Sequence, residues 1–257
     1  MKKTLRALAL CFALGLSLAT APAQVVVETA NLSLGVRSLA NNTTVTENYS
    51  FTTNSASDSV LFVGVASEDI FVINGVSYNG TSAQVLADTT FGTNQAAVFI
   101  VNLGNEVGTT ADIGVQITTQ DGDEPQIAAT AVQVSNALFN DSLGDFQSYL
   151  LTNGTVDFGG TDFPQGSFYF DMNVDLFDDA VATGLTRTAE GPAQNLPTSD
   201  ATSSYVTNVS GVISPGWQGQ GGAFAAGIIE AASIIPEPSS AALLGLGGLL
   251  LLRRRRA

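Results

Sequence analysis

The chain contains no histidine and a single cysteine, Cys11, and its lysines are confined to Lys2 and Lys3. Residues 24–235 therefore hold no His, Cys or Lys. This absence excludes a Ser-His-Asp triad, a Cys-His pair, a lysine Schiff base and a conventional zinc site. The enzymatic route that remains is a pair of carboxylates, as in glycoside hydrolysis. Because an acidic chain places some pair at a suitable separation by chance, we expect a non-enzymatic protein.

Positive charge is scarce in the same region. Of the nine basic residues only Arg37 and Arg187 lie within residues 24–235, whereas every acidic residue except Glu237 lies there. Two arginines against 22 carboxylates give that segment a formal charge of −20. Such a surface repels nucleic acid and anionic lipid headgroups and stays soluble through self-repulsion. Nucleic acid is therefore excluded as a partner.

The first 23 residues have the pattern of a secretory signal peptide. A basic start that ends at Arg6 precedes an apolar stretch over residues 7–18, and Ala21-Pro22-Ala23 forms an A-x-A cleavage site. Ala19-Thr20-Ala21 offers a competing site two residues earlier. Cleavage at either site removes Cys11, so the mature protein must be held together by its core without disulfides.

The last 22 residues combine three features in a fixed order. Pro236-Glu237-Pro238 comes first, residues 241–252 are entirely Ala, Leu and Gly, and Arg253, Arg254, Arg255 and Arg256 follow. With the two preceding serines, the uncharged stretch makes a helix of roughly 21 Å, shorter than a hydrocarbon core of about 30 Å. It can span where the bilayer thins and the arginines reach the cytoplasmic headgroups. The pattern predicts a transmembrane helix separated from an ectodomain by the prolines.

These residues resemble the PEP-CTERM sorting signal of Gram-negative bacteria, whose pattern is Pro-Glu-Pro, a transmembrane stretch and an arginine-rich end. The resemblance implies recognition by an exosortase-type processing enzyme, with cleavage near Pro236–Pro238. It also implies export, retention in the inner membrane before processing, and then a place at the cell surface or outside the cell. Members often occur in bacteria that make extracellular polysaccharide, and they are otherwise diverse. The resemblance therefore describes sorting and implies no activity.

Residues 24–235 consist of short runs rich in Val, Ile, Phe and Thr, separated by Gly, Asn and Asp, and they predict an all-β ectodomain. We expect a single antiparallel, jelly-roll-like β-sandwich of two packed sheets. Residues 60–66 and 96–102 are apolar on both faces, as in strands buried centrally. Asn74-Gly75 and Asn79-Gly80 both have the chemistry of type I′ hairpin turns.

The stretch from Val60 to residues 96–102 also resembles exported bacterial β-sandwich modules. In these modules a buried Val-Gly-Val strand is followed by a Tyr-Asn-Gly turn and an aromatic-rich strand. Val63-Gly64-Val65 and Tyr78-Asn79-Gly80 match the first two features. This resemblance implies a sandwich fold and no activity.

Residues 167–176 show the clearest alternation, with Phe168, Phe170, Met172 and Val174 on one face. The other face, which carries Asp171 and Asp175, is expected to be wet, and residues 181–188 are expected to pair with this strand. Repulsion between the two carboxylates could be relieved by calcium, which makes Asp171 and Asp175 one candidate site. Asp121 and Asp123 form a second candidate in a loop. For both pairs a merely solvated surface is the competing interpretation.

Trp217, the only tryptophan, lies in a Gly-rich stretch that predicts a loop. It could be a platform for sugar stacking or an aromatic folded over the rim of the sandwich. The leading hypothesis is an exported structural or interaction protein of the cell surface or extracellular matrix. The alternative is a carbohydrate-binding module for extracellular polysaccharide, and a carboxylate-dependent glycosidase ranks third.

Overall fold

The computed structural model describes residues 24–68, 71–119, 125–139, 147–151, 154–157, 161–175, 181–213, 216–219 and 222–232. These residues form strands and connecting turns, with no helix among them, and every strand pair is antiparallel. Gln24–Ala232 makes one compact unit. The prediction of an all-β fold is confirmed. The signal peptide, the sorting signal with its helix, and Asp121 and Asp123 all lie outside the described residues.

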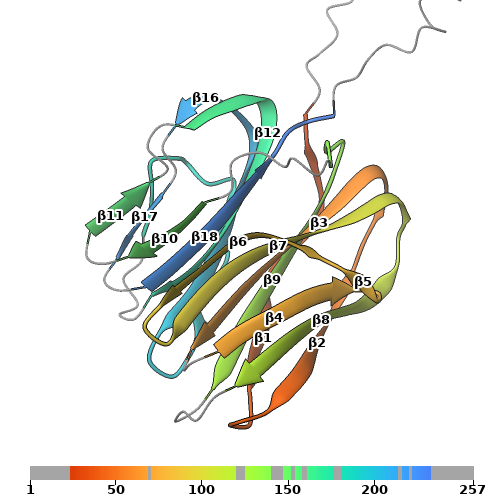
Figure 1. The fold of residues 1–257 in the computed structure, drawn as a ribbon. Helices are drawn as coiled ribbons and strands as arrows, with labels where there is room; N and C mark the ends of the chain where they lie inside the picture. The colour runs from red at the N-terminus through yellow and green to blue at the C-terminus, as the bar shows by residue number, and fades with distance from the viewer. Residues whose placement is uncertain are drawn as a thin grey trace, which may run out of the picture. The chain divides into compact units, whose positions relative to one another are not determined.

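The strands form four hydrogen-bonded sheets (Figure 1). Sheet I has the order β1-β9-β3-β7-β6, sheet II β2-β8-β4-β5, sheet III β10-β18-β12-β16-β14 with β15 beside β16, and sheet IV β11-β17-β13. In chain order the strands are β1 (Val26–Ser38), β2 (Thr44–Thr52), β3 (Ser55–Glu68), β4 (Phe71–Tyr78), β5 (Thr81–Ser82), β6 (Gln84–Phe91), β7 (Asn94–Val107), β8 (Thr110–Thr119), β9 (Gln126–Ser135), β10 (Gln147–Leu151), β11 (Gly154–Asp157), β12 (Thr161–Asp175), β13 (Val181–Thr183), β14 (Ala189–Glu190), β15 (Gln194–Asn195), β16 (Asp200–Ile213), β17 (Gly216–Gly219) and β18 (Gly222–Ile229).

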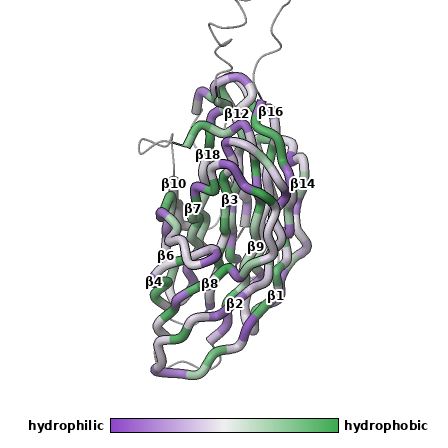
Figure 2. Tube along the Cα trace, turned by 90° about the vertical axis from the view of Figure 1, so that its right-hand side faces the viewer, coloured by the Kyte–Doolittle hydropathy of each residue, from purple (hydrophilic) through white to green (hydrophobic). Residues whose placement is uncertain are grey.

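Three apolar interiors separate these sheets. Sheets I and II enclose one that contains Phe99 and Ile113, sheets I and III enclose one built around Phe62 and Phe170, and sheets III and IV enclose a smaller one around Trp217. The sequence predicted two packed sheets, whereas the described residues form four sheets that pack one on another. Figure 2 shows hydrophobic stretches along β3 and β18, which belong to the two inner sheets.

The inner position of sheet I explains its two-sided apolar strands. Along β3, Phe62 faces sheet III while Leu61 and Val63 face sheet II, and all three side chains are fully buried. Gly64 has no room for a side chain, because a Cβ there would lie 2.7 Å from Thr130 Oγ1 of the neighbouring strand β9 and 3.1 Å from Met172 Sδ of sheet III. The prediction that residues 60–66 and 96–102 are buried is confirmed except at Asn102, which is exposed.

The two Asn-Gly pairs behave differently. Asn79 and Gly80 both have positive φ, 49° and 77°, and they form the turn between β4 and β5, as predicted. The turn predicted at Asn74-Gly75 is wrong, since β4 continues through it with a register shift between Ile73 and Gly75. Ile73 and Val76 on either side both pack into the interior between sheets I and II, so burial favours a bulged strand over a turn.

The pairing predicted for residues 181–188 is also wrong. Strand β12 is flanked by β16 and β18 in sheet III. Val181–Thr183 forms β13 and pairs instead with β17 of sheet IV, opposite Gln218, Trp217 and Gly216. The segment after β13 therefore crosses from sheet IV back to sheet III, and this crossing carries Arg187 over the face of β12.

A buried ion pair between two sheets as the candidate functional site

The face of β12 that looks toward sheet IV is polar and buried. Tyr169, Asp171, Asn173 and Asp175 alternate along it, and none of them is more than 1% exposed. Their alternation was predicted correctly, but the prediction of a wet face is wrong. Sheet IV lies over part of this face, with Trp217 of β17 in the same buried cluster as Tyr169.

Asp171 is held in place by the antiparallel register of sheet III, where it lies opposite Ser204 of β16 and Ala226 of β18. Its Oδ1 accepts hydrogen bonds from the backbone N–H and the hydroxyl of Ser204, at 2.9 and 2.6 Å. Its Oδ2 accepts from the Tyr169 hydroxyl at 2.7 Å and from the Trp217 indole N–H at 3.1 Å. Each carboxylate oxygen is therefore occupied by donors of the protein itself.

Arg187 completes this set with the only ion pair among the residues that the structure describes. Its Nη2 donates to Asp171 Oδ2 at 3.0 Å, and the side chain is 5% exposed. The same Nη2 donates to the carbonyl of Gly216 at 3.0 Å, which ties the arginine to β17. The guanidinium carbon lies 5.1 Å from the Tyr169 ring centroid and 5.8 Å from that of Trp217, at cation–π distances.

The local electrostatics follow from burial. Burial raises the pKa of Tyr169 well above its ordinary value of 10.0, and the negative charge of Asp171 raises it further, while Arg187 works in the opposite direction. The Tyr169 hydroxyl is therefore held as a neutral donor toward Asp171. A carboxylate and a guanidinium buried together need such hydrogen bonds, because their mutual attraction alone does not offset the loss of water.

This arrangement is suited to structure rather than to chemistry. A nucleophile, a general base or a calcium ligand needs an oxygen that can turn toward a substrate or an ion. Asp171 has five protein donors on its two oxygens, so the calcium candidate at Asp171 is corrected to an internal ion pair. Among the described residues, no group of three or more His, Cys, Asp or Glu side chains is arranged to hold a metal ion.

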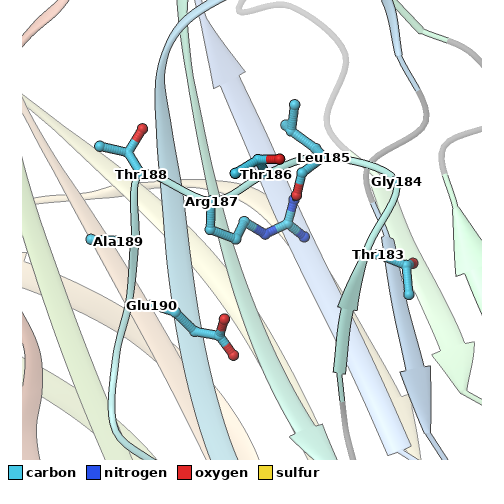
Figure 3. Close-up of a pocket in the computed structure, with 8 residues that line it drawn as sticks. All are labelled: Thr183, Gly184, Leu185, Thr186, Arg187, Thr188, Ala189 and Glu190. Atoms are coloured by element: carbon cyan, nitrogen blue, oxygen red, sulfur yellow. The ribbon is translucent and has the colours of Figure 1, made fainter.

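An open cavity of about 620 Å³ lies beside the ion pair, lined by residues 183–190 (Figure 3). Thr186, Thr188 and Glu190 of this segment are exposed. The Arg187 guanidinium turns back toward Leu185, whose carbonyl accepts from Nη1 at 3.4 Å. The cavity thus offers threonine hydroxyls and one carboxylate to solvent, while its single cation is directed into the protein.

Trp217 is corrected in the same way. It lies in strand β17 rather than in a loop, it is fully buried, and its indole N–H is bonded to Asp171. A sugar-stacking platform needs an exposed ring face, so that interpretation is excluded for this tryptophan.

Sequence reasoning missed Arg187 and Ser204 as members of this site. One signal was available for the arginine, because it is one of two cations in a segment with 22 acidic residues. Ser204 gave no signal, since its role depends on the register of β16 against β12.

No protein-family model, curated protein or solved structure matches this chain. In the part of the chain that the structure describes, no helix has the length and apolar character needed to cross a membrane.

Proposed function

We propose that this chain is an exported, non-enzymatic structural or interaction protein of the cell surface or extracellular matrix. Its C-terminal segment is a sorting signal that an exosortase-type enzyme recognises and processes in the inner membrane. We further propose that the ectodomain is a jelly-roll-like sandwich and that residues 241–252 after it form a hydrophobic helix.

The observation that carries the proposal is the order of the tail: Pro236-Glu237-Pro238, then the uncharged Ala, Leu and Gly stretch, then Arg253–Arg256. An A-x-A site at Ala21 and Ala23 supports export. The chemistry of the ectodomain fits a structural role, because it lacks His, Lys and Cys and because Asp171 is fully bonded within the protein. Support of this kind concerns sorting and stability, and no residue is assigned a catalytic role.

The test replaces Pro236, Glu237 and Pro238 by alanine in the native host, followed by fractionation with an epitope in the ectodomain. We expect the unaltered protein at the cell surface in a shortened form, and the variant at full length in the inner membrane. Replacing Ser239 and Ser240 by alanine is the matched control and should leave sorting intact. Deletion of residues 236–257 should release soluble ectodomain into the periplasm, and unchanged surface retention after that deletion would refute the sorting role.

A second candidate function, binding of extracellular polysaccharide, is favoured by the outer face of sheet II. Exposed threonine hydroxyls pair across its strands, Thr44 with Thr118 at 2.9 Å and Thr52 with Thr110 at 2.8 Å. Short hydroxyl side chains on a sheet face can exchange hydrogen bonds with sugar hydroxyls. Retardation of the protein in gels cast with a neutral polysaccharide tests this function. Thr46→Glu on this face should abolish retardation, whereas Ser210→Glu on an exposed site of β16 should not.

A further inference from the structure

Strand β2 is a long sheet edge with none of the usual protection against pairing with another chain. It is the outermost strand of sheet II and pairs with β8 over all nine of its residues without a register shift (Figure 1). Natural edge strands are protected by proline, lysine, a bulge or shortness. Thr44–Thr52 contains neither proline nor lysine, and Glu47 is its one charged residue.

The other sheet edges are all interrupted or short. Strand β1 has two register shifts and β6 has one, so both edges of sheet I are irregular. The edge strands of the remaining sheets, β5, β10, β11, β13 and β14, have five residues or fewer. In the part of the chain that the structure describes, β2 is therefore the one edge that is both long and regular.

The hydrogen bonds at the two ends of β2 show which of its backbone groups point outward. The Thr43 carbonyl accepts from the Thr119 N–H at 2.8 Å. The Thr53 N–H donates to the Thr109 carbonyl at 2.9 Å. Because these groups alternate along an antiparallel strand, odd-numbered residues bond to β8 and even-numbered ones direct their N–H and C=O away from it. The even-numbered residues, whose side chains are also exposed, are Thr44, Thr46, Asn48, Ser50 and Thr52.

We propose that two copies of this chain pair antiparallel through β2, about a two-fold axis at Asn48. In this register Asn48 lies opposite its own copy, and the even-numbered residues of each strand exchange backbone hydrogen bonds with those of the other. The two copies of the four-stranded sheet II become one continuous sheet. An isologous contact of this kind closes after two copies, so it yields a dimer and not a fibre.

The side chains that this register brings together are compatible on both faces of the sheet. On the outer face it places hydroxyl side chains opposite one another, Thr44 opposite Thr52 for example, as β2 and β8 already do. On the inner face Val45 lies opposite Phe51. Hydroxyl pairs and pairs of an aromatic with a β-branched residue both stabilise neighbouring strands.

Charge complementarity favours a second copy as the partner. Arg37 is the one exposed cation of residues 24–235, and its guanidinium carbon lies 5.1 Å from the Tyr49 ring centroid. The register places Glu47 of the second copy directly opposite Tyr49, with Cβ atoms about 4.5–5.5 Å apart. Arg37 of one copy and Glu47 of the other therefore meet beside the same ring, and symmetry repeats this contact. The two arginines also counter the repulsion between the two Glu47 carboxylates, which lie diagonally across the axis.

The dimer goes beyond the proposed function, since it requires neither surface sorting nor polysaccharide. It leaves the exposed hydroxyls on the outer face of sheet II uncovered, because the contact uses the edge of the sheet.

The first test cross-links the axis in the full-length chain in detergent, with Cys11 replaced by alanine so that introduced cysteines are the only thiols. Asn48→Cys places two thiols at the axis, and mild oxidation should give a covalent dimer. Ser50→Cys, on the same strand and face, is the matched control. Its two thiols lie four positions apart along the strand, roughly 13 Å, so this variant should not cross-link.

The second test measures the dissociation constant of the dimer by sedimentation equilibrium in density-matched detergent. Arg37→Glu should weaken the dimer at least about tenfold, because it meets Glu47 of the second copy, and adding Glu47→Arg should restore it. Ser50→Pro removes an outward N–H that β8 does not use, so it should weaken the dimer while the circular dichroism stays unchanged.

A chain that stays monomeric at its highest soluble concentration would overturn the proposal. Equal cross-linking of Asn48→Cys and Ser50→Cys would overturn it as well, since pairing about Asn48 cannot give that result. Circular dichroism verifies that each variant is folded, and Ser50→Pro decides the matter if the charge variants do not fold. A dimer that Ser50→Pro leaves at full strength would place the contact elsewhere and refute the role of β2.

Discussion

Replacement of Arg187 by methionine tests whether the buried ion pair holds sheet IV on sheet III. Methionine keeps the length and apolar body of the side chain but removes the charge, so Asp171 remains as a buried carboxylate without its counter-ion. Breaking a buried pair in this way costs about 3–5 kcal/mol in free energy of unfolding. For a domain of this size each kcal/mol lowers Tm by about 2–4 °C, so we expect a fall of roughly 6–20 °C.

Urea unfolding followed by fluorescence is the appropriate assay, because Trp217 is the only tryptophan and its indole N–H is bonded to Asp171. Arg37→Met is the matched control. Arg37 is exposed, and its guanidinium carbon lies 5.1 Å from the Tyr49 ring centroid, so its loss should cost under about 1 kcal/mol.

The double variant Asp171→Asn, Arg187→Met provides the sharper measurement. Each single change leaves one charge or one set of donors unmatched, whereas the double change removes both charges together. Residues of one hydrogen-bonded network couple by about 0.5–3 kcal/mol. The double variant should therefore lose less free energy of unfolding than the sum of the losses in the two single variants. Strictly additive losses, or an Arg187→Met variant within 1 kcal/mol of the unaltered protein, would refute the assignment of this pair as the contact between the sheets.

Three further predictions address other parts of the fold. Gly64→Ala should cost about 1–3 kcal/mol because its Cβ would overpack sheets I and III, whereas Gly75→Ala, with nothing within 4 Å, should be close to neutral; denaturant midpoints compare the two. Burial raises the pKa of Tyr169, so the neutral hydroxyl stabilises the fold fully below pH 10. As the pH rises above 10 this stabilisation falls by up to about 1.4 kcal/mol per pH unit. Tyr169→Phe removes the ionisable group and should therefore make the alkaline fall in Tm shallower. Glu68→Ala should cost about 1–3 kcal/mol and expose residues 191–199 to limited proteolysis, because the backbone N–H of Thr198 donates to this buried carboxylate at 2.8 Å.

The parts of the fold that sequence could predict are those where one strand contains its own signal. Residues 60–66 are apolar at every position, and this alone indicates burial on both faces whatever the neighbours are. Asn79-Gly80 forms the predicted turn because Thr81 and Ser82 after it are exposed, so no buried residue extends β4 beyond Tyr78. At Asn74-Gly75 the burial of Ile73 and Val76 favours a continuous strand over a turn. The residues of sheet I that bury them come from other parts of the sequence, so the pattern around Asn74 does not reveal this.

The candidate site could not be predicted because the strands of sheet IV, which buries it, show no recognisable alternation of apolar and polar residues. Strands β11, β17 and β13 contain 4, 4 and 3 residues, too few to show a period of two. Without sheet IV, the alternation of Asp171 and Asp175 with apolar residues predicts a strand with one wet side. Because sheet IV was not predicted, Trp217 was assigned to a loop, although it is fully buried.

Short strands also explain why this interface contains an ion pair. Among the side chains that the structure describes, the buried apolar cluster between sheets III and IV has fewer members than either of the other interiors: Phe163, Tyr169, Val206, Val209, Trp217, Phe224, Ala226 and Ile228. Apolar contact is non-directional, so a cluster of this size leaves the position of three short strands weakly specified. Arg187 supplies direction, because its Nη2 reaches both Asp171 of β12 and the Gly216 carbonyl of β17. We infer that one of the two arginines of residues 24–235 lies inside the protein, away from its acidic surface, because there it determines which part of sheet III the outer sheet covers.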